Sequence, residues 1–465
     1  MSYETALAQM YALGHELAQT PSHKFDLAHI RVLLAALGHP EHRFPTVLIA
    51  GTNGKGSTAA TLASILQASG LKTGLYTSPH LVRINERIRL NGKAIDDDDF
   101  ALLHDVVDRT AERLVGEGDL PWHPSFFEML TAMGFEYFAP SRPDMVVLEV
   151  GMGGRLDATN VVEPRVSIIT DIALDHQKYL GETVAEIARE KAGIIRPGGI
   201  VVTLPQLPEA NSVIGNTILD VGARAVNAVQ YVPPVSPGSG EYMSCQWPVA
   251  GGQSPESSRR GQRYPLEVHG ETILVESPLV GRHQLRNVAL AIAAAEELHN
   301  QGIVQITPET IARGIRETQW PGRFQVVPAA GGDPEYVLDV AHNPAGAWAL
   351  RSTLSAAYGD LGNGREITMV FGVMRDKAVR EIAEILFPIA GRVILTHANN
   401  PRSASPAEIR QAAARVAAGI DIEEAEDVAS ALDRVREVAG SGGLVVVTGS
   451  IYIVGEAMRM LGVRI

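Results

Sequence analysis

The chain contains only one cysteine, Cys245, among its 465 residues. An intrachain disulfide is therefore excluded, and the composition fits a reducing compartment. The first twenty residues include Glu4, His15 and Glu16 and have no continuous apolar stretch, which argues against a secretory signal peptide. No run approaches the ~20 apolar residues that a membrane-spanning helix needs. We therefore expect a cytoplasmic protein that does not enter a membrane.

Positive charge is also in deficit, with 40 Lys and Arg against 53 Asp and Glu and a formal net charge of −13. Broad binding to nucleic acid or to anionic membranes requires a net cationic face, so neither partner is expected. The 45% hydrophobic content is typical of a globular protein. A chain of 465 residues is too long for one hydrophobic core, which predicts two or three domains.

A glycine-rich turn follows the apolar run 47–50 and precedes a helical pattern at 59–70; it reads Gly51-Thr52-Asn53-Gly54-Lys55-Gly56-Ser57-Thr58. A strand, a glycine turn with Lys-x-Ser and a helix together form a phosphate cradle. Backbone N–H groups and the helix N-terminus face the anion, Lys55 spans the terminal phosphates and Ser57 ligates Mg²⁺. The spacing departs from the common G-x-x-x-x-G-K-[ST] form, and an ordinary glycine turn is the alternative. The pattern nevertheless predicts binding of a nucleoside triphosphate.

Short Val/Ile/Leu-rich runs alternate with helical patterns from Val47 onward, which predicts an α/β fold built on a parallel sheet. Expected strands lie at 73–77, 145–150, 166–170 and 200–204, and expected helices at 59–68, 127–138, 184–194, 285–298 and 308–318. Residues 230–263 are rich in Pro, Gly and Ser and are expected to form an exposed loop or hairpin insertion.

A second series of strands and helices begins beyond residues 319–322. Its expected strands are 336–340, 367–373, 392–396 and 444–448, with helices at 378–386 and 406–417. We therefore expect an ATP-binding domain over 1–318 and a second α/β domain over 319–465, which has the usual size of an independent domain.

Polar residues stand at several expected strand ends, where ligands of open α/β sheets bind. Glu149 ends one strand and could join Ser57 on Mg²⁺, although a surface glutamate is about as well supported by the sequence. Asp175 and His176 follow another strand, but a lone histidine is more often structural. Lys191 lies late in a helix, where a cation complements the helix dipole.

Cationic and polar residues cluster in three further segments. Residues 76–89 concentrate His and Arg after a strand, which suits an anionic substrate or, equally, a solvated face. Residues 339–344 close a strand and open a helix with Pro344 near its first position. Arg323 is expected to be an unpaired cation at the domain boundary that could reach a phosphate.

Together these motifs resemble the Mur ligase superfamily, and within it the dihydrofolate synthase/folylpolyglutamate synthase family. The resemblance runs from about Lys24 to Tyr452 and implies a Mur-ligase-type ATPase domain followed by a Rossmann-like C-terminal domain. Its most specific pieces are residues 51–57, 76–87, 125–128, 149–160, 174–176, 190–193, 339–344 and 448–450.

The resemblance implies a role for each residue that matches a family motif. ATP would be held by the loop Gly51–Thr58, with Asn287 facing adenine, Arg323 reaching the phosphates and Asp339 the ribose. Two Mg²⁺ ions would be held by Ser57, Glu149, His176 and a carbamylated Lys191, and a monovalent cation is also implied. Lys55, Lys191 and His342 would act in catalysis. Folate or glutamate would contact Ser78, Pro79, His80, Arg83, Arg87, Phe127, Asp157 and Ser450.

The activity that the resemblance implies is ATP-dependent ligation of L-glutamate to dihydropteroate, to a reduced folate, or to both, through an acyl phosphate and with release of ADP. Two alternatives stay open at the level of the residues. One is another Mur-type amide ligase that acts on a UDP-sugar precursor of peptidoglycan; the other is a non-catalytic nucleotide-dependent switch. Nothing in the sequence requires more than a monomer.

Overall fold

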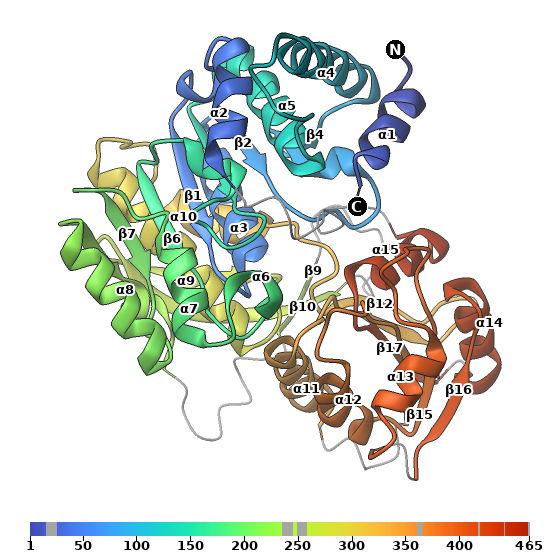
Figure 1. Ribbon diagram of the computed structural model, residues 1–465. Coiled ribbons are helices and arrows are strands. Elements are labelled where there is room, and N and C mark those ends of the chain that lie inside the picture. Colours follow the sequence, from blue (N-terminus) through green and yellow to red (C-terminus); the bar gives the residue numbers. More distant parts are fainter. Residues whose placement is uncertain are drawn as a thin grey trace. The chain divides into compact units, whose positions relative to one another are not determined.

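The computed structural model describes residues 1–14, 26–234, 245–248, 258–359, 366–416, 419–440 and 442–463. The chain divides into two compact units (Figure 1). Unit 1 comprises Met1–Val232, Glu267–Ile273 and Asn287–Glu317, and unit 2 comprises Pro233–Leu266, Leu274–Arg286 and Thr318–Ile465. Unit 2 therefore takes in segments that precede residue 319 in the sequence.

Unit 1 is built on an eight-stranded sheet in the order β4-β3-β2-β5-β1-β6-β7-β8. The central strand β1 (Thr46–Ala50) pairs in parallel with β5 (Met145–Glu149) and with β6 (Val166–Ile169). The parallel part continues through β2 (Thr73–Tyr76), β7 (Ile200–Thr203) and β8 (Arg224–Asn227), whereas β3 (Ile88–Leu90) and β4 (Lys93–Ala94) are antiparallel. The expected α/β class with parallel sheets is confirmed.

The helices of unit 1 alternate with these strands. They are α1 (Tyr3–Ala12), α2 (Leu27–Ala36), α3 (Lys55–Ala68), α4 (Asp97–Glu117), α5 (Phe126–Ser141), α6 (Gln177–Leu180), α7 (Val184–Ala192), α8 (Pro208–Asp220), α10 (Pro308–Glu317) and most of α9 (Arg282–Asn300). Short 3₁₀ turns lie at η1 (Pro40–His42), η2 (Ile84–Arg87), η3 (Ala158–Val161) and η4 (Ala228–Tyr231). Among the described residues, no helix is both long and apolar enough to cross a membrane.

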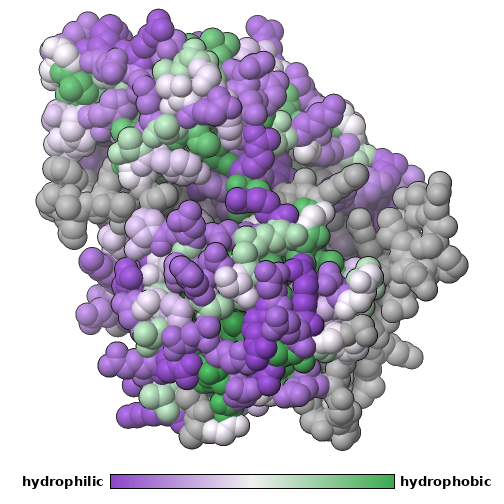
Figure 2. Space-filling view, turned by 90° about the vertical axis from the view of Figure 1, so that its right-hand side faces the viewer, coloured by the Kyte–Doolittle hydropathy of each residue, from purple (hydrophilic) through white to green (hydrophobic). Residues whose placement is uncertain are grey.

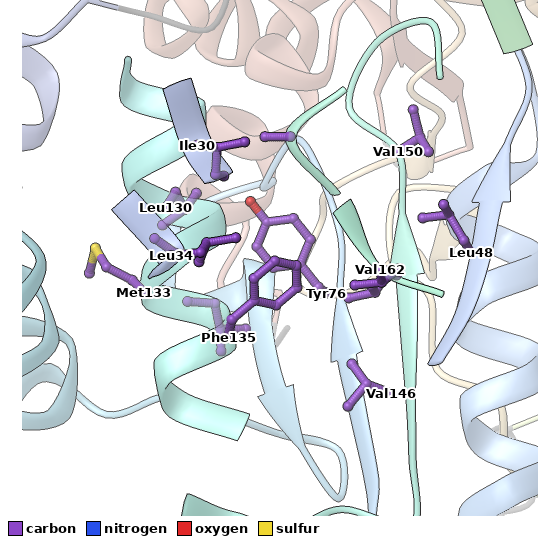
Figure 3. Packing of buried hydrophobic residues seen from close by; sticks show 14 of the residues in the cluster. Ile30, Leu34, Leu48, Tyr76, Leu130, Met133, Phe135, Val146, Val150 and Val162 are labelled. Atoms are coloured by element: carbon purple, nitrogen blue, oxygen red, sulfur yellow. The ribbon is translucent and has the colours of Figure 1, made fainter. Parts of the chain in front are cut away.

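The core of unit 1 joins α2 and α5 to one face of the sheet (Figure 3). Tyr76 of β2 is buried there beside Phe135 of α5, and its hydroxyl lies 3.1 Å from Thr131 Oγ1. The hydrogen bond satisfies the only polar atom of a large buried side chain. This packing fixes the end of β2, from which the segment 77–89 departs.

Unit 2 contains a six-stranded sheet in the order β12-β13-β17-β14-β15-β16. Strand β12 (Gln325–Val327) is antiparallel to β13 (Glu335–Leu338), and the other strands, β14 (Ile367–Phe371), β15 (Arg392–Leu395), β16 (Asp421–Glu424) and β17 (Leu444–Thr448), are parallel. Its helices are α11 (Pro344–Tyr358), α12 (Val379–Leu386), α13 (Pro406–Ala412), α14 (Val428–Ala439) and α15 (Ile451–Met460), with a 3₁₀ turn η6 (Phe387–Ile389).

A third, three-stranded sheet has the order β11-β10-β9. Strand β9 (Cys245–Pro248) pairs antiparallel with β10 (Ser258–Val268), and β11 is Glu271–Ser277. Of the expected insertion at 230–263, residues 235–244 and 249–257 lie outside the described residues. On the face seen in Figure 2, hydrophilic residues predominate and hydrophobic ones form small separate spots among them.

Candidate active site

The phosphate loop (Gly51–Gly54) leaves the C-terminal end of β1 and contains two glycines. A side chain at either glycine would displace neighbouring atoms. A Cβ atom on Gly51 would lie 1.7 Å from Thr170 Oγ1. Gly54 has φ +90° and precedes the first residue of α3, and a Cβ there would lie 2.1 Å from Asn287 Oδ1. Because Gly54 ends the loop, α3 begins at Lys55 rather than at residue 59. Lys55 and Ser57 are therefore both in the first turn of a helix.

The segment that follows β6 holds this loop from the side. The Asp171 carbonyl accepts hydrogen bonds from Thr52 N at 2.9 Å and Asn53 N at 3.1 Å. Thr52 Oγ1 donates to Ala173 O at 3.0 Å and accepts from Ala173 N at 3.1 Å. The expectation that the backbone N–H groups of the loop face a phosphate is thus wrong for Thr52 and Asn53. The first-turn N–H groups of α3, which have no intrahelical acceptor, remain for the anion.

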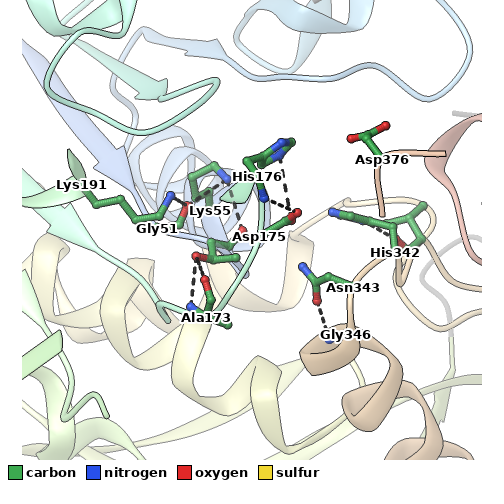
Figure 4. A network of polar contacts seen from close by, with 12 residues as sticks. Gly51, Lys55, Ala173, Asp175, His176, Lys191, His342, Asn343, Gly346 and Asp376 are labelled. Atoms are coloured by element: carbon green, nitrogen blue, oxygen red, sulfur yellow. Dashed lines mark hydrogen bonds and ion pairs between the residues drawn. The ribbon is translucent and has the colours of Figure 1, made fainter. Parts of the chain in front are cut away.

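Two lysines converge on one carbonyl group at this loop (Figure 4). Lys55 Nζ donates to Gly51 O at 3.2 Å and to Thr52 O at 3.3 Å, and Lys191 Nζ donates to Gly51 O at 2.7 Å. Lys191 is fully buried. Burial, reinforced by the positive charge of Lys55 and opposed by Asp175 and Asp157, lowers the pKa of Lys191 from 10.5 to about 7. A cation of this kind is not the dipole-capping surface lysine that the local pattern favours.

Acidic side chains lie at the neighbouring strand ends. Glu149, the last residue of β5, is buried and accepts a hydrogen bond from Ser78 N at 3.1 Å. Asp157 is buried, accepts from Met152 N at 2.9 Å and from Thr159 Oγ1 at 2.6 Å, and has a pKa raised by that burial. Asp175 Oδ1 accepts from His176 N at 2.8 Å, and His176 Nε2 lies 3.9 Å from Asp175 Oδ2.

These donors suit magnesium by chemical type. Mg²⁺ prefers oxygen ligands and usually takes one or two carboxylates together with substrate phosphates. Ser57 on α3 and Glu149 on β5 are both buried oxygen donors of unit 1. Within the described residues, Glu149, Asp175 and His176 do not form a set of three ligands within 4.8 Å of one another. The residues therefore fit a site that the nucleotide's own phosphates complete, rather than a preformed protein cage.

The helix after the loop is tied to α9. Thr58 Oγ1 donates to Asn287 O at 3.3 Å, and the Asn287 side chain packs on Gly54. Asn287 is buried at this contact. The structure thus places Asn287 beside the phosphate loop.

The arginines of the segment 76–89 are largely engaged inside unit 1. Arg83 pairs with Asp97 at 2.6 Å, and its guanidinium lies 5.5 Å from the centre of the Tyr3 ring. Arg87 is buried; its Nε donates to His80 Nδ1 at 2.9 Å, and the guanidinium lies over Phe126. The segment is therefore neither a solvated face nor an array of uncommitted cations. The Ser78–Pro79 peptide bond is cis, and Ser78 is nearly buried beside Glu149.

Phe127 borders the loop that follows β5. Its ring packs on Gly151, where an added Cβ would lie 2.6 Å from Phe127 Cζ, and it meets Tyr76 edge-on with centroids 6.3 Å apart. Phe127 is only partly buried, so part of its surface stays available to a ligand.

The candidate residues of unit 2 surround the end of β13 and the start of α15. Asp339 is buried and accepts from Phe324 N at 2.8 Å and Ala341 N at 2.9 Å; burial raises its pKa, and Arg323 opposes that rise. Arg323 also lies over Trp320 at 6.0 Å, so the expectation of an unpaired cation is wrong. His342 Nδ1 lies 2.9 Å from Val340 O, and Ser450 caps α15 by accepting from Tyr452 N at 3.2 Å.

Two residues that the sequence analysis passed over have clear roles in this geometry. Thr170 packs on Gly51, and Asp171 supplies the carbonyl that anchors Thr52 and Asn53. Both stand directly after β6, the strand that neighbours β1. Their position at a strand end was the available signal, but the backbone role of Asp171 is independent of its side chain.

A Gly151→Ala substitution tests the contact between the β5 loop and Phe127. The added methyl group overlaps the ring, so we expect a loss of about 1–3 kcal/mol in the free energy of unfolding. In a Phe127→Ala background the methyl group has room, and most of that loss should disappear in a double-mutant cycle measured by urea unfolding. Equal losses in both backgrounds would contradict the contact.

Comparison with known proteins agrees with this geometry. Residues 128–295 match the Mur ligase middle domain, and residues 322–451 match the Mur ligase glutamate ligase domain. The chain is 34% identical to the dihydrofolate synthase/folylpolyglutamate synthase of Bacillus subtilis, covering 94% of this chain and 95% of that protein. It is 33% identical to the folylpolyglutamate synthase of Lacticaseibacillus casei, covering 99% of both.

A solved structure shows the same relationship in three dimensions. The folylpolyglutamate synthase of Mycobacterium tuberculosis complexed with ADP and AMPPCP superposes with a TM-score of 0.84 at 30% identity, covering 99% of each chain. These similarities extend over nearly the whole length of this chain and of its relatives. They therefore include the phosphate loop, the acidic residues at the strand ends and the second unit. The chain therefore belongs to the dihydrofolate synthase/folylpolyglutamate synthase family of Mur ligases.

Proposed function

We propose that this protein ligates L-glutamate to dihydropteroate and to reduced folates, using ATP and releasing ADP and phosphate. The observation that carries the proposal is the convergence of Lys55 and buried Lys191 on the phosphate loop, in a chain of this family. The curated relatives differ in whether their names include one ligation or two, and the bifunctional activity follows the Bacillus subtilis relative. The UDP-sugar ligase and the non-catalytic switch have no support from these relatives.

The chemistry requires activation of a carboxylate, because oxide is a poor leaving group. Transfer of the ATP γ-phosphoryl group to the pteroate or folate carboxylate gives an acyl phosphate, which the glutamate amine attacks with loss of phosphate. The protein's part is to position the reactants and neutralise charge. Lys55 and the first turn of α3 receive the phosphates, and Mg²⁺, when bound at Ser57 and Glu149, supplies further positive charge to their oxygens.

Lys191 is the residue whose chemistry depends most on its surroundings. A pKa near 7 leaves a large fraction of the amine neutral under physiological conditions, and only a neutral amine reacts with CO₂ to form a carbamate. Carbamylation would replace a cation that is held beside Lys55 by an anion that can pair with it. We therefore propose that Lys191 is carbamylated, with His176 nearby in the second metal position.

The remaining roles are proposed from family position and local placement. Phe127 and Ser78 stand beside the β5 and β2 strand ends and would border the pterin, with Pro79, His80 and Asp157 supporting that wall. Arg83 and Arg87 already contact Asp97 and His80, so they would act by holding the segment 76–89 in its conformation. In unit 2, Arg323, Asp339, His342 and Ser450 would serve nucleotide and glutamate binding. The protein is expected to act as a monomer.

The bifunctional assignment is tested by ADP release with MgATP and L-glutamate, in parallel with 7,8-dihydropteroate or a reduced folate. We expect both acceptors to stimulate release. Stimulation by one acceptor alone would restrict the assignment to that step. Stimulation by neither, in protein that binds ATP, would overturn the proposed function.

A Lys55→Ala substitution tests the phosphate loop. Removing the charge from a preorganised site should lower the ligation rate by at least about 100-fold, because such electrostatic contacts act mainly in the transition state. Lys93→Ala is the matched control, since Lys93 is an exposed lysine of the same unit, and it should keep the wild-type rate. Thermal unfolding of Lys55→Ala should match the wild type. Wild-type turnover in Lys55→Ala would contradict the assigned role.

Buried Lys191 predicts a characteristic pH dependence of stability. The amine titrates near 7 in the folded chain but near 10.5 when exposed, so between these values the unfolded chain binds one proton more. The free energy of unfolding should therefore rise with pH from about pH 7 upward, and the penalty for burying the charged amine is complete below that pH. In CO₂-free buffer, Lys191→Met should flatten this rise.

Bicarbonate provides the second arm of this experiment. At about pH 8, where most of the Lys191 amine is neutral and can react, bicarbonate should increase the Tm of the wild type, because the carbamate is an anion that can pair with Lys55 in the folded chain, and it should leave Lys191→Met unchanged. The same pH slope in both proteins would contradict the buried, shifted lysine. A bicarbonate effect shared by both would contradict carbamylation at this residue.

A further inference from the structure

A cluster of two histidines and a glutamate lies on the segment that leads into β1, apart from the candidate active site. His39 Nδ1 is 3.0 Å from Glu41 Oε1, and His42 Nε2 is 3.5 Å from the same oxygen. The two imidazole rings are stacked, with centroids 5.0 Å apart and planes inclined by 11°. One ligand atom from each of the three residues lies within 4.8 Å of the other two, the one such set of His, Cys, Asp and Glu among the described residues.

These distances match the edges of a tetrahedral metal site. Ligand atoms at about 2.0–2.2 Å from a zinc ion stand about 3.3–3.6 Å from one another, close to the 3.0 and 3.5 Å that separate Glu41 Oε1 from the two imidazole nitrogens. The stacked rings must turn for both nitrogens to face one ion, and both side chains are exposed enough to do so. Two imidazole nitrogens and one carboxylate oxygen are a ligand set that zinc accepts in proteins, and a fourth position stays open to water. Imidazole favours zinc over magnesium, which prefers oxygen ligands.

The charge around Glu41 independently favours a cation. The side chain is only 5% exposed, and its Oε2 atom is buried with no hydrogen-bond partner among the described residues. A carboxylate in this position is expensive to desolvate unless a positive charge compensates it. The nearest arginine in the sequence, Arg43, is engaged with a backbone carbonyl: its Nη2 donates to Gly38 O at 2.9 Å.

A second carboxylate adds to the negative charge. Glu136 lies on α5, the helix against which η1 packs. Burial raises the pKa of Glu136; Arg43 opposes this rise and the charge of Glu41 adds to it. His39 and His42 are more than half exposed, so an ion can reach them from solvent.

We propose that His39, Glu41 and His42 form a binding site for a zinc-class divalent transition metal. The site stands at the N-terminal end of β1, whereas the phosphate loop follows its C-terminal end. Five strand residues, roughly 17 Å, therefore separate it from the nucleotide. All three ligands come from the short segment 39–42, which leads into the strand that carries the phosphate loop. The metal site does not depend on the proposed ligase activity.

The test is zinc binding by chelator-treated, untagged full-length protein, measured by isothermal titration calorimetry in excess Mg²⁺ to occupy oxygen-rich sites. We expect one zinc ion per chain at this site. His42→Gln should weaken its binding by at least about tenfold. His39→Asn should do the same; asparagine is chosen because residue 39 has φ +55°, which asparagine tolerates. His123→Gln is the matched control, since His123 also pairs with one carboxylate, Asp108, at 3.1 Å.

X-ray absorption at the zinc edge of the wild-type protein gives a readout that does not depend on the folding of any variant. Two imidazole nitrogens and at least one carboxylate oxygen should surround the ion at about 2.0–2.2 Å. The proposal is overturned if zinc does not bind, or if His39→Asn and His42→Gln bind it as tightly as His123→Gln. It is also overturned if the absorption spectrum contains no imidazole.

Discussion

The hydrogen bond from Lys191 to the Gly51 carbonyl is the interaction on which the candidate site depends. It places a buried amine directly beneath the phosphate loop, 2.7 Å from an oxygen that Lys55 also contacts. Burial removes the water that would solvate the charged amine, and repulsion by the positive charge of Lys55 adds to that cost. The pKa of about 7 is the consequence. A lysine in this state can change its charge at physiological pH by losing a proton or by reacting with CO₂, which an exposed lysine would not do.

The sheet order explains how residues distant in sequence reach this lysine. Strand β1 lies between β5 and β6, so the segments that follow all three strands emerge side by side at one edge. The loop after β1 carries Gly51, the end of β5 carries Glu149, and the residues after β6 include Asp171 and Asp175. The chain also reverses its direction across the sheet at β1, and ligands of open α/β sheets bind at such a switch point. Topology therefore assembles the acids and lysines before any ligand arrives.

The sequence predicted most of this architecture because its signals are local. Continuous apolar runs identified β1, β5, β6 and β17, and the glycine turn located the phosphate loop. Helix α4 was not predicted, although its signals are also local: Asp96 caps it, acidic residues fill its first turn, and its buried residues, among them Phe100, Val107 and Leu114, recur at helical spacing. By contrast, the pairing of Arg83 with Asp97 joins residues from different elements, so no local pattern could reveal that the arginine was engaged. The burial of Lys191 is also a tertiary property; in sequence it was indistinguishable from a dipole-capping lysine, and only the family resemblance singled it out.

Close packing of glycines keeps the buried lysine in place. A Cβ atom on Gly154 would lie 2.9 Å from Glu190 O and 3.0 Å from Lys191 O, so the loop after β5 touches the last turn of α7 only because residue 154 has no side chain. Arg155 strengthens the same contact, since its N–H donates to Glu190 O at 2.8 Å and its guanidinium pairs with Glu190 at 2.9 Å. The absence of a side chain at these glycines therefore allows neighbouring segments to pack closely. A well-packed interior resists relaxation, so the amine cannot easily move out to water, and the energetic cost of burying it is expressed as a shifted pKa instead. The reactivity proposed for Lys191 therefore depends on the close packing at Gly51 and Gly154 as well as on the lysine itself.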